Sequence, residues 1–225
     1  MNKERIIATL ESIKKSQALT ISEYNSVVDI IAEAAAELQH EANKSRGCAS
    51  LEKPFMNVLK DAIKLSGYDK PLNRAVKHGG FTWVCDSHRI LATAANIDLP
   101  ENTGDDAERY PKIWDIMTQT ETETAGTVQE LPTAAEIKQG IKSATERAKL
   151  AGRKAKDIRP VYRFPDGYAV NARFLLDLVL ATGAKTMRYA GAVKPAFAES
   201  EDGQTKGLLL PIRWTGPEVY GFTTL

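Results

Sequence analysis

The sequence predicts an α+β protein in which amphipathic helices pack on antiparallel strands, with a helical extension in front of them. Three observations support this class. Apolar residues recur at three- and four-residue steps in several stretches, which is typical of helices. Short apolar runs flank the turn sequences Gly79-Gly80 and Glu201-Asp-Gly203, which is typical of hairpins. The chain has 225 residues, enough for one large domain or two smaller ones.

The composition is that of an ordinary water-soluble protein, with 43% hydrophobic and 26% charged residues. Lys and Arg (30) nearly balance Asp and Glu (29), but a local basic face, not the total, decides nucleic-acid binding. Cys48 and Cys85 have no spacing that suggests a disulfide framework or zinc. We find no apolar run long enough for a signal peptide or a membrane span, so we expect a cytoplasmic protein.

Residues 1–50 are predicted to form a helical segment. The sequence Thr20-Ile-Ser-Glu23 has the pattern of a capping box, in which a hydroxyl and a carboxylate satisfy main-chain donors at a helix start. Apolar residues follow at helical spacing: Val27, Ile31, Ala34, Ala35 and Leu38. We expect this segment to pack on the main body or to mediate self-association, and to carry no chemistry.

Residues 51–117 are predicted to form a first unit that begins with a helix. Phe55, Leu59 and Ala62 fall on one side of it, and Lys60 and Lys64 on another. Residues 72–77 and 81–85 then flank the Gly79-Gly80 turn and predict a hairpin. Residues 86–89 are expected to turn, and 90–93 to form another strand. Residues 98–126 lose periodicity and predict a loop or interdomain linker.

Residues 118–225 are predicted to form a second, more complete unit. It should contain a strand near residue 127, a helix at about 133–151, a strand pair at about 159–170, another helix and a three-stranded meander. Asn171 is a favoured N-cap residue for the second helix, and Gly183 lies where its end requires a left-handed residue.

The helix at 133–151 is predicted to have separate apolar and basic faces. At about 100° per residue, four cations fall within an arc of roughly 60°: Lys138, Lys142, Lys149 and Arg153. Four apolar residues cluster roughly 130° away: Ile137, Ile141, Ala144 and Ala148. Such a basic row suits a run of phosphates, which are bound mainly by charge. A solvated lysine-rich face is the plainer explanation for one such helix, but the helix near 55–65 repeats the pattern with Lys60 and Lys64.

Four motifs resemble those of DNA polymerase sliding clamps of the bacterial beta-subunit type, including short phage or prophage clamp-like proteins. Asn171-Ala-Arg-Phe-Leu-Leu-Asp177 is similar to the clamp helix that precedes a meander, and Leu209-Leu-Pro-Ile-Arg213 to the sequence that ends it. Asp86-Ser-His-Arg89 is similar to a clamp turn that has Gly where this chain has Ser87. The change to serine is tolerable if position 87 does not need a positive φ. Arg109-Tyr-Pro-Lys-Ile-Trp114 is similar to the segment that crosses between clamp domains.

The resemblance implies a non-catalytic processivity factor that binds duplex DNA without sequence specificity and tethers a DNA polymerase. Helices would line the inner face and antiparallel sheets would lie outside, with Tyr110 and Trp114 packed between domains. The expected DNA-binding residues are Lys60, Lys64, Lys138, Lys142, Lys149 and Arg153, with Arg89 as a lesser contact. A clamp ring has six domains, so two domains per chain would imply a homotrimer. The residues from 214 onward could cover the groove that binds polymerase peptides.

Two other functions are compatible with the sequence. The chain could keep the clamp fold but act as a protein-interaction adaptor that does not encircle DNA. An enzyme would have to rest on Asp86, Ser87 and His88, yet adjacent residues rarely face one another as a nucleophile and its base must. No phosphate-binding glycine loop and no metal-ligand spacing occur, so we expect no catalytic residues, no cofactor and no metal.

Overall fold

A computed structural model of the chain describes residues 49–66, 71–123, 126–154, 157–213 and 221–222. The helical prediction for residues 1–48, with its capping box, lies outside these residues, as does nearly all of the chain beyond residue 213. Ser50–Leu225 form one compact unit. In the described part of the chain, no helix has the length and apolar character needed to cross a membrane.

Helices and antiparallel strands are interspersed along this unit, which confirms the α+β class. The first half contains α3 (Ala49–Ser66), the 3-10 helix η1 (Pro71–Asn73), β1 (Val76–His78), β2 (Phe81–Cys85), β3 (Arg89–Thr93), α4 (Asp105–Glu108) and α5 (Ile113–Glu123). The second half contains β4 (Thr127–Glu130), α6 (Ala134–Leu150), β5 (Val161–Arg163), β6 (Ala169–Asn171), α7 (Ala172–Thr182), β7 (Thr186–Tyr189), β8 (Ala196–Glu199), β9 (Thr205–Leu209) and β10 (Gly221–Phe222).

One seven-stranded antiparallel sheet joins the two halves, in the order β1-β2-β3-β9-β8-β7-β4. Its central pairing is between β3 and β9, with Leu91 opposite Gly207. The strands of the first predicted unit, β1 to β3, therefore continue directly into the meander at the other end of the chain, which is formed by β7 to β9. The boundary expected near residue 117 falls within a body that shares this sheet. A second sheet has the order β10-β5-β6, in which β10 runs parallel to β5.

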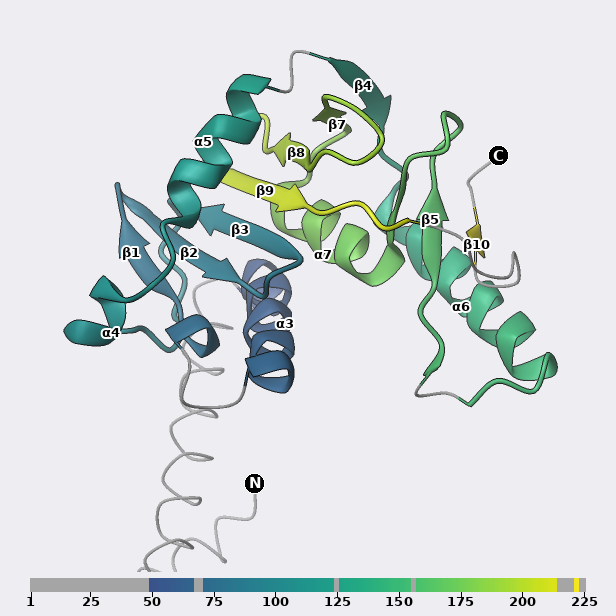
Figure 1. The fold of residues 1–225 in the computed structure, drawn as a ribbon, viewed down its shortest axis with the longest axis horizontal. Coiled ribbons are helices and arrows are strands. Elements are labelled where there is room, and N and C mark those ends of the chain that lie inside the picture. The colour runs from purple at the N-terminus through teal and green to yellow at the C-terminus, as the bar shows by residue number, and fades with distance from the viewer. Residues whose placement is uncertain (1–48, 67–70, 124–125, 155–156, 214–220, 223–225) are drawn as a thin grey trace, which may run out of the picture. The chain divides into compact units, whose positions relative to one another are not determined.

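The seven-stranded sheet buries a separate apolar cluster on each face, because successive side chains of a strand point to opposite sides. Val84 and Leu91 belong to a cluster that includes apolar residues of α3, α6 and α7. Trp83 and Ile90, their neighbours along the strands, belong to a second cluster with Ile113 and Met117 of α5. Helices α3 and α7 thus lie on one face of the sheet and α5 on the other (Figure 1).

The prediction of a loop or linker at residues 98–126 was wrong for its second half, which forms helix α5. The threonines of this stretch favour helices only weakly. Ile113, Met117 and Thr120 nevertheless fall on one helical face and are buried, so burial against the sheet outweighs the low helix propensity of the threonines.

Tyr110 and Trp114, which were expected to pack between domains, both belong to the surroundings of this sheet face. Tyr110 is buried within the apolar cluster on the α5 face, and Trp114 packs against that cluster. Both residues therefore pack within this unit.

The helix ends follow the sequence signals closely. The Asn171 side chain accepts a hydrogen bond from the main-chain N–H of Arg173, and Gly183 has a φ of 61° at the end of α7. A capping box also starts α6, where the Thr133 hydroxyl and the Glu136 carboxylate each bind the other residue's main-chain N–H. These caps fix where α6 and α7 begin and hence which side chains reach their exposed faces.

Candidate nucleic-acid interface

Helix α6 has the two faces that its sequence predicts. Ile137, Ala144 and Ala148 are buried, whereas Lys138, Lys142, Lys149 and, just beyond the helix end, Arg153 are exposed. The basic row therefore faces solvent along the axis of a helix that is anchored by its other side.

Helix α3 repeats this arrangement on a smaller scale. Phe55, Val58 and Leu59 are buried in the cluster that α3 shares with α7, while Lys60 and Lys64 are exposed. The Lys64 ammonium lies 2.9 Å from a carboxylate oxygen of Asp61, but 74% of its side chain remains accessible. An ion pair this exposed is weak and leaves the lysine able to take another partner.

Helices α4 and α5, on the opposite side of the sheet, carry more carboxylates than cations, although Glu121 and Glu123 are paired with Lys206 and Lys194. Between residues 105 and 123, in α4, α5 and their connection, carboxylates outnumber cations: Asp105, Asp106, Glu108, Asp115, Glu121 and Glu123 against Arg109 and Lys112. Because α5 packs on one face of the sheet and α3 and α7 on the other, the carboxylates of α4 and α5 lie on the face opposite the lysines of α3.

Arg89 does not belong to the basic surface, and the prediction that it contacts DNA is wrong because its side chain is buried. Only 1% of its side chain is accessible. The guanidinium donates from Nε to Asp86 at 2.8 Å, from Nη2 to Asp61 at 2.8 Å and from Nη1 to Asp177. Its Cζ also lies 4.2 Å from the ring centre of Phe174. Arg89 therefore ties β3 to α3 and α7 from within, and no phosphate can reach it in this arrangement.

The carboxylates around Arg89 are held by further contacts. Asp177 accepts a hydrogen bond from the Asn57 amide at 2.8 Å. Burial raises the pKa of the Asp177 carboxyl above its ordinary value, although Arg89 and Asn57 act in the opposite direction. Sequence reasoning missed Asp61, Asp177 and Asn57. One signal was available, since an arginine inside an apolar strand and an aspartate inside an apolar helix stretch predict a buried ion pair.

The Asp86-Ser-His-Arg89 turn has a structural explanation. The Asp86 carboxylate accepts hydrogen bonds from the main-chain N–H groups of His88 and Arg89, both at 3.0 Å, as well as from the Arg89 side chain. The His88 ring stacks near Phe174, with ring centres 5.9 Å apart. Asp86 thus fixes the turn and orients Arg89, so this geometry gives no support to an Asp-His-Ser catalytic arrangement.

Ser87 adopts a φ of 72°, and no other non-glycine residue in the described ranges has a positive φ. The turn therefore requires a left-handed conformation at position 87. Serine would replace glycine there without strain only if the φ of this residue were negative, and it is not. Replacing Ser87 by glycine should raise the free energy of unfolding by about 0.5–1 kcal/mol, because a Cβ disfavours this conformation. Urea denaturation would measure the change. Ser87→Ala is the control, since it keeps the Cβ; an equal gain from alanine would contradict this explanation.

Cys85 is a buried thiol beside this turn. Burial raises the pKa of the thiol to about 11, so it stays protonated at neutral pH and is a poor nucleophile or metal ligand. Among the described residues, no group of three or more His, Cys, Asp or Glu side chains is placed to hold a metal ion.

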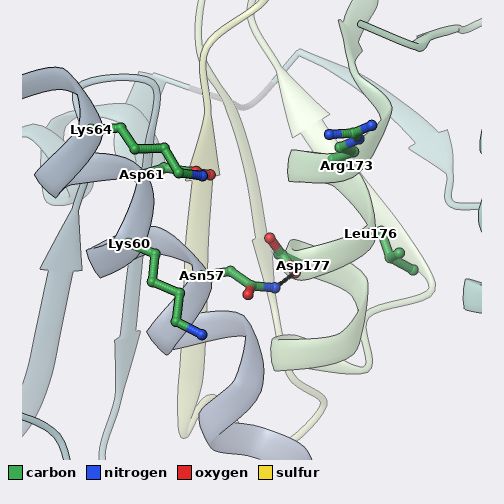
Figure 2. Close-up of a pocket in the computed structure, with 7 residues that line it drawn as sticks. All are labelled: Asn57, Lys60, Asp61, Lys64, Arg173, Leu176 and Asp177. Atoms are coloured by element: carbon green, nitrogen blue, oxygen red, sulfur yellow. Dashed lines mark hydrogen bonds and ion pairs between the residues drawn. The ribbon is translucent and has the colours of Figure 1, made fainter. Parts of the chain in front are cut away.

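A cavity lies between α3 and α7, on the side of the sheet that carries the lysines (Figure 2). Its volume is about 300 Å³, and it is lined by Asn57, Lys60, Asp61, Lys64, Arg173, Leu176 and Asp177. Of the predicted DNA-binding residues, it brings together Lys60 and Lys64 only. The four cations of α6 and its end do not line it.

No protein-family model matches the chain, and no curated protein matches it in sequence. Among solved structures, the chain is similar to bacterial beta sliding clamps. For the clamp of C. crescentus, the identity is 15%, the alignment covers 73% of this chain and 64% of the clamp, and the TM-score is 0.39. For the DNA polymerase III beta chain of Streptococcus pneumoniae, the values are 13%, 71%, 63% and 0.41.

The Helicobacter pylori beta clamp bound to a DNA ligase peptide is similar to the same degree, with 12% identity, 70% and 63% coverage and a TM-score of 0.41. The chain thus spans less than two thirds of the length of each of these clamps.

Proposed function

We propose that this chain is a clamp-like processivity factor without catalytic activity, which holds duplex DNA against the basic faces of α3 and α6 and tethers a DNA polymerase. The observation that carries the proposal is the exposure of Lys60, Lys64, Lys138, Lys142 and Lys149 on two helices whose apolar sides belong to one core cluster. Burial of their apolar sides fixes the orientation of both helices and so the direction in which their lysines point.

The chemistry of this surface favours binding without sequence reading. Lysine is a compact, mobile point charge, which suits phosphate oxygens better than the edges of bases. Repulsion from the acidic α4–α5 side would keep DNA away from the opposite face of the sheet and so favour one orientation. The polymerase partner and a homo-oligomeric ring are parts of the proposal that rest on the resemblance of the Asn171–Asp177 and Leu209–Arg213 motifs to those of clamps.

The double change Lys138→Glu with Lys142→Glu tests the DNA surface. Both side chains are exposed, so folding should be unaffected. Affinity for a mixed-sequence duplex should fall at least roughly tenfold at low salt, and the slope of log K against log salt should fall by about two, since each lost phosphate contact removes roughly 0.9. Fluorescence anisotropy over a salt titration measures both quantities.

The control reverses two charges on the acidic side, Arg109→Glu with Lys112→Glu, and changes net charge by the same amount. It should alter binding much less. Equal losses in the two variants would contradict a specific α6 surface. No binding by the wild type at low salt, together with a monomer or dimer by light scattering, would favour the adaptor that does not encircle DNA.

A further inference from the structure

The cavity between α3 and α7 is lined by cations from both helices. Lys60 of α3 and Arg173 of α7 are exposed and line the same cavity. Within the described part of the chain neither forms an ion pair, whereas the neighbouring Lys64 is paired with Asp61. Two such cations on either side of one concave site attract an anion, and burying part of that anion strengthens the attraction.

The carboxylates weaken this attraction without cancelling it, because Asp61, Asp86 and Asp177 are outnumbered by four cations, Arg89, Lys64, Lys60 and Arg173. Asp61 and Asp177 both bind the buried Arg89, and each has a second donor, Lys64 for Asp61 and Asn57 for Asp177. Figure 2 shows the Asn57 amide and the Asp177 carboxylate directed toward one another between the two helices. Their oxygens are therefore occupied by protein donors. Lys60 and Arg173 therefore determine that the cavity favours an anionic ligand.

We propose that this cavity is a phosphate-binding subsite, in which Arg173 and Lys60 attract a phosphate group into the space between α3 and α7. The proposal deepens the proposed function, on which it rests for the source of the phosphate, a duplex DNA backbone. It adds Arg173, which no feature of the sequence singled out. Arginine suits this position because its planar guanidinium binds two phosphate oxygens at once, while Lys60 supplies a mobile charge from the facing helix.

The fixed separation of α3 and α7 makes such a subsite possible. The Arg89 guanidinium bridges Asp61 of α3 and Asp177 of α7, and the Asn57 amide adds a direct bond between the helices. The two cations are thus mounted on helices locked together before a ligand arrives. A preformed site of this kind loses little conformational entropy on binding.

The test compares the full-length wild type with Arg173→Gln and Lys60→Gln, using Arg109→Gln on the acidic side as the matched control. Each variant is titrated with a mixed-sequence duplex at several salt concentrations and, separately, with inorganic phosphate by NMR. Arg173→Gln should weaken duplex binding roughly three- to tenfold at low salt and lower the salt slope by about 0.9, the value for one phosphate. Inorganic phosphate should shift wild-type amide signals at residues 57–64 and 172–177, and the shifts should be lost in Arg173→Gln.

Titration with both duplex DNA and inorganic phosphate shows whether the phosphate subsite or the proposed DNA binding is wrong. If the wild type binds duplex and Arg173→Gln behaves like Arg109→Gln, the subsite is overturned while DNA binding stands. If no duplex binds but phosphate shifts the cavity signals in an Arg173-dependent way, the subsite stands and its phosphate comes from a smaller molecule. If neither ligand produces an Arg173-dependent effect, the subsite is overturned.

Discussion

Replacing Arg89 by methionine should lower the free energy of unfolding by about 3–5 kcal/mol at neutral pH, because it leaves buried carboxylates without their cation. The Arg89 side chain is 1% accessible, and those of Asp86 and Asp177 are 0% and 8% accessible. Methionine keeps most of the volume of the arginine stem, so the loss reports on charge more than on a cavity. Urea denaturation at about pH 8 measures it.

The loss should shrink at lower pH, and the sign follows from the pKa of Asp177. Burial raises the pKa of this carboxyl and Arg89 lowers it, so removing Arg89 raises it further. A carboxyl whose folded-state pKa lies above its unfolded value destabilises the fold at high pH, and the penalty disappears as pH falls below the unfolded pKa. The Arg89→Met variant should therefore approach the wild type as pH falls from 8 toward the unfolded pKa of an aspartate, about 3.9.

Arg188→Met is the matched control for this prediction. Arg188 also pairs with a carboxylate, that of Glu199 at 3.2 Å, and its Cζ lies 5.1 Å from the Phe197 ring centre, but 37% of its side chain is accessible. Solvent screening limits its expected loss to about 1 kcal/mol or less, with little dependence on pH. A similar loss in both variants, or no pH dependence for Arg89→Met, would show that the buried charges do not carry the stability assigned to them.

Local signals in the sequence predicted the elements that carry the candidate interface. Residues 133–151 were predicted as a helix, and α6 spans Ala134–Leu150. Asn171 and Gly183 predicted the two ends of α7 correctly. The start depends only on the Asn171 side chain as N-cap, and the end only on a left-handed backbone at Gly183. The exposed face of α6 followed from the same periodicity, since the apolar residues that anchor the helix fix where its lysines point.

Long-range pairing could not be predicted in the same way. The contact between β3 and β9 joins residues more than a hundred positions apart, and no local pattern specifies which meander completes the first hairpin. Helix α5 was missed for a related reason, because the sheet face that buries Ile113 and Met117 exists only once β3 and β9 have paired. Arg89 was misplaced since a cation beside a turn resembles a surface residue until Asp61 and Asp177 arrive from other elements.

Replacing Gly207 by valine should lower the free energy of unfolding by about 3 kcal/mol, by forcing α7 away from the sheet. Gly207 lies in β9 between Leu91 of β3 and Ala198 of β8. A Cβ at this position would lie far inside van der Waals contact with Leu178 of α7 and 2.9 Å from the Leu91 side chain. Both leucines are fully buried, so neither can rotate away into solvent. Glycine here permits the close approach of a helix to a central strand.

A double-mutant cycle with Leu178→Ala isolates this steric cause. Leu178→Ala alone should cost about 2–5 kcal/mol by leaving a cavity, but the same space accommodates the valine side chain. The double variant should therefore lose less than the sum of the two single losses, by about 1 kcal/mol or more, as expected for residues in contact. Additive losses in urea denaturation would show that Gly207 is not required for the packing of α7. The cycle bears on the interface as well, because α7 carries both Arg173 and the Asp177 that holds Arg89.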